Sequence, residues 1–231
     1  IEMNTVIVIA AHPDDEVLGC GGTIAKHVHD GDEVHVLILA EGMTSRDDTR
    51  DRKGREKDIT KLKDMANEAH NILGTSSTKL FDFPDNRMDS VDLLDVIKVI
   101  ENEINEKNPE IIYTHHHNDL NVDHRITHQA VFTACRPEPG AIVKKIYCFE
   151  VPSSSEWQDP LKGSQFIPNT FVNISNTLEI KLAALRAYES EMKPWPHSRS
   201  IQAIEYLARW RGASAGFEAA EAFSLSRNIV S

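Results

Sequence analysis

Short apolar segments that alternate with amphipathic helical segments most constrain what this 231-residue chain can fold into. Residues 5–11 (TVIVIAA) form a continuous apolar, largely β-branched run, which is typical of a strand buried on both faces of a parallel sheet. Residues 33–40 (EVHVLILA) form a second such run. Between the two, the three glycines of residues 19–22 indicate a break in the backbone, and residues 23–29 are predicted to be helical.

The same alternation continues to about residue 150. Its further predicted elements are helices at 59–73, 91–104 and 123–135 and strands at 79–83, 110–114 and 144–150. This order predicts an α/β fold of the Rossmann-like, doubly wound kind, in which a mostly parallel sheet carries helices on both faces. Beyond a Ser-, Pro- and Trp-rich surface loop at 152–170, helices are expected near 176–193 and 199–212. We therefore expect a single domain over residues 1–231 with a C-terminal helical elaboration.

The charge balance of the chain excludes several classes of partner. The formal net charge is −11, whereas nucleic acids and anionic membranes are bound by basic surfaces. We therefore expect a small-molecule partner and no nucleic acid. No window approaches about 20 apolar residues, so no transmembrane segment is expected. The three cysteines show no CxxC spacing, which argues against a cysteine zinc site and suits a reducing cytoplasm.

Three predicted strands are followed by segments rich in side chains that can bind a metal ion or a polar ligand. These segments are HPDDE at residues 12–16, EGMTSR at 41–46 and HHHNDLNVDH at 115–124. In open α/β sheets, ligands bind beyond the carboxyl ends of the strands. Imidazole and carboxylate groups crowded there repel and desolvate one another unless a cation lies among them. Such groups are zinc-type ligands, and a catalytic zinc keeps about three protein ligands and one open position.

The spacing within the first of these segments separates its carboxylates. Pro13 fixes one φ angle of a tight turn, so His12 and Asp15 can approach one metal while Asp14 turns toward a different neighbour. A ligand pair and a free carboxylate result. His124, near the start of the predicted helix after the fourth strand, could supply a third ligand from across the sheet.

Two motifs resemble those of a known family. Residues 11–25 (AHPDDEVLGCGGTIA), followed by Val122-Asp123-His124, are similar to the motifs of the PIG-L/LmbE family of zinc-dependent N-acetylglucosaminyl de-N-acetylases. The resemblance covers roughly residues 4–150. It implies one deacetylase domain that acts on an N-acetylated amino sugar, and family members often assemble into homo-oligomers.

The resemblance also implies roles for individual residues. It assigns zinc binding to His12, Asp15 and His124, and it makes Asp14 the general base. The family often has a histidine three residues before the last ligand, which helps to polarise the amide carbonyl, whereas this chain has Asn121.

The replacement at position 121 leaves the carbonyl-polarising role open. Asn121 could still donate a hydrogen bond, or a neighbour such as His116 or His117 could take over. Asp123 is expected to accept a hydrogen bond from a ligating imidazole and so orient it.

Other residues at the same rim are candidates for substrate contacts. Arg46 follows the second strand, and Asp85 and Asn86 follow the third, where they could bind sugar hydroxyls or phosphate. The segment 195–199 (WPHSR) could close over the site, because Trp195 and His197 offer stacking and hydrogen bonding to sugars, or it could be only a structural corner. The glycines of residues 19–22 lack the pattern of a phosphate-binding loop, which favours close packing of a helix on the sheet.

These observations predict a zinc-dependent hydrolase that removes the acetyl group of an N-acetylated amino sugar. The same ligands accept Fe²⁺ or Co²⁺. Two alternatives remain: a zinc amidase acting on another N-acyl molecule, such as a thiol cofactor precursor or an antibiotic, and a sugar-binding module without turnover. Asn121 is the feature that favours the second alternative.

Overall fold

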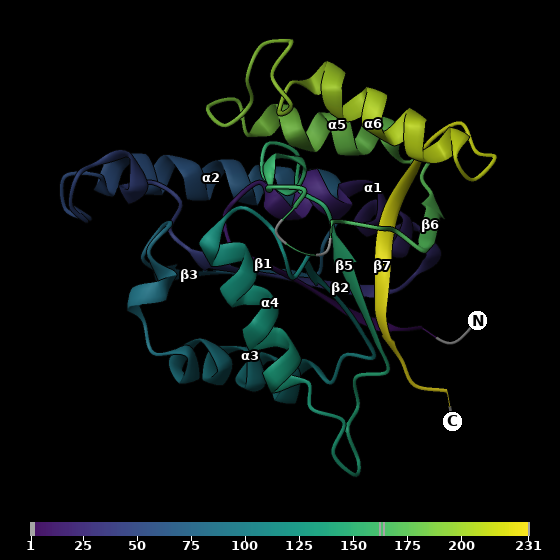
Figure 1. Cartoon of the computed structure of the whole chain (residues 1–231), viewed down its shortest axis with the longest axis horizontal. Helices are drawn as coiled ribbons and strands as arrows, with labels where there is room; N and C mark the ends of the chain where they lie inside the picture. The colour runs from purple at the N-terminus through teal and green to yellow at the C-terminus, as the bar shows by residue number, and fades with distance from the viewer. Residues whose placement is uncertain (1–2, 162, 164, 231) are drawn as a thin grey trace.

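The computed structural model, which describes residues 3–161, 163 and 165–230, is built on one seven-stranded sheet (Figure 1). The strand order is β3-β2-β1-β4-β5-β7-β6. The first five strands in this order are parallel, and β7 runs antiparallel to both of its neighbours. The strands are β1 (Thr5–Ala10), β2 (Glu33–Ala40), β3 (Ser77–Phe83), β4 (Ile111–His115), β5 (Lys145–Phe149), β6 (Thr170–Asn173) and β7 (Ala220–Asn228).

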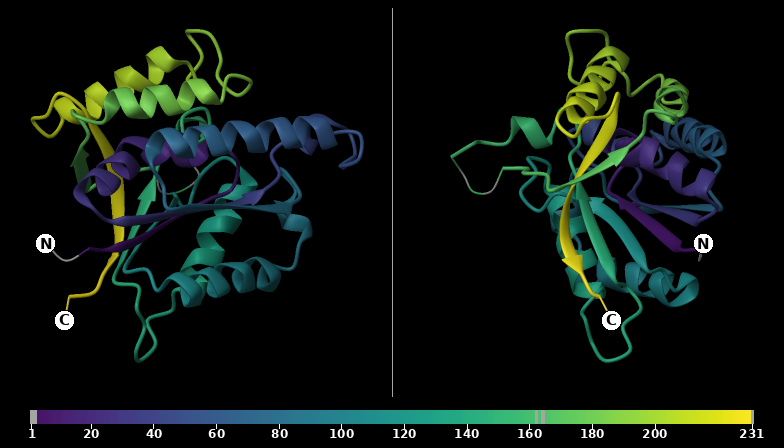
Figure 2. Two further views of the ribbon diagram at one scale, coloured as in Figure 1. Left: turned by 180° about the vertical axis from the view of Figure 1, so that it is seen from behind. Right: turned by 90° about the vertical axis from the view of Figure 1, so that its right-hand side faces the viewer.

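Helices cover both faces of this sheet, as the alternation of elements predicts. Helices α1, α2, α5 and α6 contribute to the core on one face, and α3 and α4 to the core on the other (Figure 2). The helices are α1 (Asp15–Asp30), α2 (Glu56–Leu73), α3 (Leu93–Lys107), α4 (Val122–Ala134), α5 (Leu178–Ala187) and α6 (Ile201–Ala213). Three short 3₁₀ turns are η1 (Thr44–Arg46), η2 (Met88–Ser90) and η3 (Ser155–Trp157). The predicted α/β fold is confirmed.

Strand β1 shows why a continuous apolar run marks a central parallel strand. Its side chains alternate between the two faces: Val6 and Val8 belong to the core beneath α1 and α2, whereas Ile7 and Ile9 belong to the core beneath α3 and α4. All four are at most 1% exposed. Because both faces are covered, the strand is apolar from Val6 to Ala10, and its one polar residue, Thr5, is the only one that is not fully buried.

The predicted break at residues 19–22 is confirmed in part: the glycines lie inside α1 rather than in a loop, but the helical geometry is interrupted between them, at Cys20. A Cβ on Gly19 would lie 2.3 Å from the Phe149 ring, so glycine is needed for close approach of the helix to the sheet. The helix bends at Cys20, whose φ of −148° is not helical. After the bend, Gly22 and the next residue donate their N–H groups to the carboxylate of Glu221. The glycines therefore allow close packing of α1 on the sheet. The sequence favoured this interpretation over a phosphate-binding loop.

The C-terminal third adds strands as well as the expected helices. Helices α5 and α6 were predicted, but β6 and β7 were not. In β7 only the first four residues are buried, and the rest are partly or fully exposed. Such a strand lacks the apolar run that identifies a central strand, and its pairing with β5 is long-range. Among the described residues, no helix is long and apolar enough to span a membrane.

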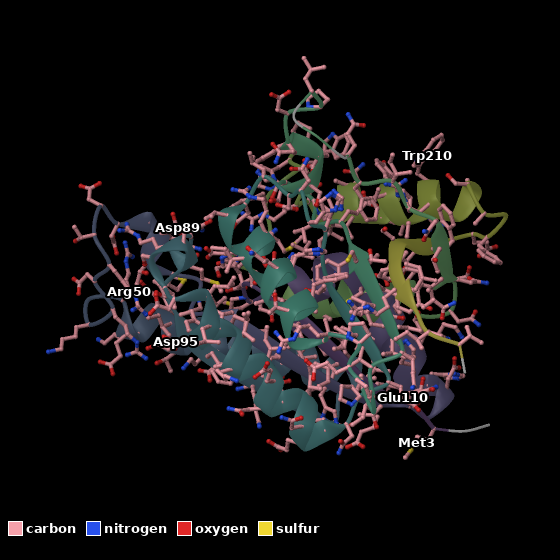
Figure 3. All side chains as sticks on the ribbon, turned by 60° about the horizontal axis from the view of Figure 1, so that its bottom comes forward. Met3, Arg50, Asp89, Asp95, Glu110 and Trp210 are labelled. Atoms are coloured by element: carbon pink, nitrogen blue, oxygen red, sulfur yellow. The ribbon has the colours of Figure 1, made fainter. Side chains whose placement is uncertain are left out.

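The strand order creates a crevice at the carboxyl ends of β1 and β4. The chain moves from β1 toward β2 and β3 on one side, and from β4 toward β5 on the other. At such a topological switch point the connecting loops separate and leave room for a ligand. The outer surface is charged elsewhere, with Arg50, Asp95 and Glu110 exposed at the periphery (Figure 3).

Candidate metal centre and its pocket

Three side chains from two loops meet at this crevice. His12 Nδ1 lies 3.1 Å from Asp15 Oδ2, and His124 Nε2 lies 3.1 Å from the same oxygen. The two imidazole nitrogens are 3.3 Å apart. The three donor atoms thus form a nearly equilateral triangle, and the predicted ligands are brought together.

The dimensions of this triangle fit a tetrahedral divalent cation. Ligand atoms at the usual zinc distances of about 2.0–2.1 Å are separated by about 3.3 Å when they occupy corners of a tetrahedron. The triangle therefore has the spacing of three corners of such a tetrahedron. Two imidazoles and one carboxylate suit zinc and also Fe²⁺ or Co²⁺.

Local chain geometry explains how the first loop presents its two ligands. Strand β1 ends at Ala10, and α1 begins at Asp15 after the tight turn at Pro13. The His12 N–H donates to Asp15 Oδ2 over 2.9 Å, which fixes the carboxylate beside the imidazole. His124 lies in the first turn of α4 and packs flat on His115, with ring centroids 3.9 Å apart.

Each imidazole of the triangle has a carboxylate behind it. His12 Nε2 contacts Asp123 Oδ2 at 2.9 Å, which is the contact that the predicted orienting role of Asp123 requires. His124 Nδ1 lies 3.0 Å from Asp119 Oδ1. Asp119 was missed, because nothing in its local sequence separates it from the other polar residues of the 115–124 segment.

A second group of possible ligands, His12, Asp85 and Asp123, is better explained as this outer layer. The Asp123 carboxylate already accepts hydrogen bonds from the N–H groups of Asn86 at 2.6 Å and Met88 at 3.0 Å. The oxygens of Asp85 likewise accept from the Asn86 amide and from a backbone N–H of the η1 turn. Because these carboxylate oxygens already accept hydrogen bonds, we interpret Asp85 and Asp123 as residues that position their neighbours and not as ligands of a second ion.

The electrostatics of the centre favour a positive charge. Burial opposes charge on His124, but the carboxylates of Asp15 and Asp119 outweigh it and raise its pKa to about 9. Burial would raise the pKa of Asp119, yet His124 and two serine hydroxyls hold it well below its usual range. By contrast, burial and the neighbouring His124 lower the pKa of His115. A cation between the ligands is stabilised by the same carboxylates.

Asp14, unlike the next residue Asp15, turns its carboxylate away from the triangle. It is 3% exposed and its Oδ2 lies 3.2 Å from Arg199 Nη1. Burial, and then the charge of Asp15, raise the pKa of Asp14, while Arg199 opposes them. Asp14 is thus a free carboxylate beside the metal ligands, with a cationic partner that was not predicted.

A pocket of about 210 Å³ opens above these groups and gathers most of the predicted site residues. Its lining includes His12, Asp14, Asp15, Arg46, Asp85, Asn86, Asn121 and His124. Asp123 is fully buried behind His12 and does not line it. Arg199 and Glu191 also line it and were missed, because they are far from the motifs in sequence; Glu191 accepts a hydrogen bond from Arg46.

Two predicted substrate contacts, His116 and His197, lie outside this lining. His116 is buried and packs against His117 and Phe166. His197 Nδ1 accepts the N–H of Arg199 at 3.0 Å, so it contacts the pocket only through that residue.

Asn121 has a structural function in addition to its place in the pocket. It is the N-cap of α4: its Oδ1 accepts the Asp123 N–H at 2.8 Å. Its Nδ2 donates to Asn86 Oδ1 at 2.7 Å. An amide nitrogen carries two hydrogens, so one donor of Asn121 is not accounted for by this bond.

Sequence and structure comparisons identify relatives of this chain. Residues 7–135 match the model of the PIG-L family, described as GlcNAc-PI de-N-acetylase. An uncharacterized deacetylase, YaiS, of Escherichia coli K12 is 30% identical over 191 residues, which cover 80% of this chain and 90% of that protein. Diacetylchitobiose deacetylase of Thermococcus kodakarensis is 29% identical over 208 residues, or 82% of this chain and 71% of that protein.

The fold is also shared with an enzyme of a different class. The crystal structure of a 4-carboxy-2-hydroxymuconate hydratase from Pseudomonas putida KT2440 superposes with a TM-score of 0.79 at 24% identity. The match covers 99% of this chain and 98% of that one, and it shows the fold alone. The family match includes the first motif and His124, and it extends over more than half of the chain. With the metal-ligand triangle and the sequence relatives, these findings show that the chain belongs to the PIG-L family.

Proposed function

We propose that this protein is a metal-dependent hydrolase that removes the N-acetyl group of an N-acetylated amino sugar, with zinc as the preferred ion. The observation that carries the proposal is the triangle of His12, Asp15 and His124 beside the free carboxylate of Asp14, all in one pocket. This arrangement supplies the two functions that hydrolysis of an unreactive amide needs, an electrophile and a base. The deacetylases among the relatives support the same reaction class.

The chain's own residues divide the chemistry as follows. When bound by the triangle, a divalent cation polarises a carbonyl and lowers the pKa of a water toward neutrality. The Asp14 carboxylate accepts a proton from the attacking water and returns it to the departing amine nitrogen. Arg199 holds the Asp14 carboxylate in place through its 3.2 Å contact.

Polar side chains around the pocket are proposed to bind the substrate. Arg46, Asp85 and Asn86 present hydrogen-bonding groups suited to sugar hydroxyls. Asn121 lines the pocket and His116 does not, so we assign the donor for the substrate carbonyl to the Asn121 amide. His197 is proposed to act indirectly, by fixing the backbone at Arg199.

Acetate release from a substrate panel tests the proposal. Protein loaded with Zn²⁺, Fe²⁺ or Co²⁺ would be assayed with N-acetylglucosamine, diacetylchitobiose, a nucleotide-linked N-acetyl sugar and N-acetylglucosaminyl glycosides. We expect release that depends on metal, and a fall of about 10²–10⁴-fold in kcat in Asp14→Asn. Asp89→Asn, an exposed carboxylate, is the matched control. Failure of every loaded form to release acetate would refute the proposal.

The same panel separates the alternatives. Release of an acyl group only from N-acyl thiol precursors or acylated antibiotics would identify an amidase of different specificity. Tight sugar binding without turnover would identify a binding module. Because a hydratase shares the fold, 4-carboxy-2-hydroxymuconate is included as a control substrate. A cytoplasmic location and a homo-oligomeric state stay predictions; the first is supported by three buried cysteines without disulfides.

A further inference from the structure

The backbone of Asp14 is held in an unfavourable conformation. Its φ is 115° and its ψ is −29°, a region that residues with a Cβ rarely adopt. Such a conformation costs on the order of 1–3 kcal/mol and persists only where surrounding contacts impose it. Asp14 also begins α1, because its carbonyl accepts the N–H groups of Val17 and Leu18.

The carboxylate of Glu16 contacts the backbone of Asp14 in this conformation. Its Oε2 accepts the Asp14 N–H at 3.1 Å. Its Oε1 accepts two further hydrogen bonds, from Tyr188 Oη at 2.7 Å and from His70 Nε2 at 3.0 Å. Glu16 is 0% exposed, so these three donors replace the water that a carboxylate needs.

The two side chains that hold Glu16 come from distant parts of the fold. His70 lies in the last turn of α2, and its Nδ1 contacts the hydroxyl of Thr78 on β3 at 2.9 Å. Tyr188 directly follows α5, is 0% exposed and lies outside the residues that match the family model. The network therefore connects the turn at Asp14 to α2, β3 and the C-terminal segment.

We propose that Glu16 is a positioning residue that holds Asp14 in its left-handed turn, and that Tyr188 and His70 keep Glu16 in place. The catalytic consequence depends on the proposed function, since it matters only if Asp14 acts as the base. The structural consequence does not. In this arrangement the turn directs the Asp14 carboxylate toward Arg199, whereas the carboxylate of the adjacent residue, Asp15, lies in the triangle with His12 and His124.

Glu16→Gln tests the proposal with the least change of shape. A glutamine has one oxygen and one NH₂ group, so it keeps the Asp14 hydrogen bond only if its NH₂ group faces Tyr188 and His70 and both of these accept instead of donating. In either orientation the charge-assisted hydrogen bonds of the carboxylate become weaker neutral ones. A buried Glu outside the network is the matched control. Glu221 is 4% exposed and accepts two backbone N–H groups and Lys181 Nζ, so Glu221→Gln removes a comparable carboxylate.

The two variants are distinguished by steady-state kinetics with metal analysis. In Glu16→Gln we expect kcat to fall on the order of 10–100-fold, because a small displacement of a catalytic group has that effect. KM and bound metal should stay within about twofold, since the substrate-binding residues and ligands are unchanged. Glu221→Gln should lose stability but keep kcat. Equal kcat values for the two variants, or loss of metal from Glu16→Gln alone, would overturn the proposal.

Tyrosine variants keep the test decisive if Glu16→Gln does not fold. Tyr188→Phe removes one hydroxyl from the network, and Tyr113→Phe removes one buried hydroxyl bonded to His27 elsewhere. A hydrogen bond of about 1 kcal/mol corresponds to about fivefold, which is the expected loss of kcat in Tyr188→Phe only. An equal effect of both variants would contradict the positioning role.

A crystal structure of metal-free Glu16→Gln tests the positioning independently of activity. We expect Asp14 to leave the region of φ near 115°, with its carboxylate displaced from Arg199. An unchanged Asp14 would overturn the inference. If the wild-type protein proves inactive on every acetylated sugar, the proposed function fails, whereas this comparison still decides whether Glu16 controls the turn. Tyr188→Phe crystals serve the same purpose if the first variant does not fold.

Discussion

Replacing Asp123 by asparagine tests how far the outer carboxylates control the metal centre. Asp123 Oδ2 accepts from His12 Nε2 and from the Asn86 N–H, and its Oδ1 accepts the Met88 N–H. In Asp123→Asn, an NH₂ group must replace one of these oxygens. It then faces the Met88 N–H, or it faces both His12 and Asn86.

The size of the effect follows from these contacts. A buried donor that faces another donor costs about 1–3 kcal/mol of folding stability. Loss of the negative charge behind His12 also reduces the basicity of the ligating imidazole. Replacing such a partner typically weakens metal binding about 10–100-fold, equivalent to about 1.4–2.7 kcal/mol. We therefore expect Asp123→Asn to fold, with a modest loss of stability and a metal affinity reduced within this range.

Competition with a chromophoric chelator measures the Zn²⁺ affinity of each variant. Asp85→Asn is the matched control, because Asp85 Oδ1 lies 3.4 Å from the same His12 nitrogen and is too distant for a strong hydrogen bond. We expect its affinity to change by less than about threefold. An Asp123→Asn affinity equal to that of the wild type, or an equal loss in both variants, would refute the assignment.

Three further predictions concern stability measured by urea unfolding. Gly19→Ala places a Cβ 2.3 Å from the Phe149 ring, so it should cost about 1–3 kcal/mol or more, and wild-type stability would contradict the packing argument. Burial lowers the pKa of His128 to about 4 from 6.5. Between these two pH values His128 is protonated in the unfolded chain and neutral in the native state, so protonation favours unfolding. His128 alone should therefore lower stability by about 2 kcal/mol between pH 7 and pH 5, and His128→Gln should remove this contribution from the slope; a slope equal to that of the wild type would show that His128 does not contribute. Lys181→Met leaves the Glu221 carboxylate buried without its cation, which should cost about 3–5 kcal/mol, and a loss below about 1 kcal/mol would show that the pair contributes little.

The parallel half of the fold was predictable because its signals are local. The apolar run of residues 5–11 and the helical period of residues 59–73 each report burial within one element. The structure places the corresponding elements at Thr5–Ala10 and Glu56–Leu73. Strand β7 was not predictable, since its pairing with β5 joins residues about 80 positions apart and only half of it is buried.

The metal ligands were predictable for a different reason. Their residue types and spacing are demanded by coordination chemistry, and the strand ends on which they lie meet at one edge of a parallel sheet. Arg199 and Asp119 could not be found in this way. Arg199 reaches Asp14 from a turn before α6, and Asp119 is recognisable only once its carboxylate lies behind His124.

The glycines of residues 19–22 show that a local rule can locate a kink without predicting that the helix continues on both sides of it. Glycine usually weakens a helix, so the cluster indicated a break. Here the close approach of α1 to Phe149 requires glycine at position 19, and Glu221 supplies acceptors after the bend at Cys20. Tertiary packing therefore overrode helix propensity.

Anomalous diffraction from crystals grown with stoichiometric Zn²⁺ tests the central claim most directly. The account predicts one dominant peak within about 2.0–2.2 Å of His12 Nδ1, Asp15 Oδ2 and His124 Nε2, with the Asp14 carboxylate outside the coordination sphere. A peak bound instead by His12 Nε2, Asp85 and Asp123, or no ordered peak at the triangle, would contradict it.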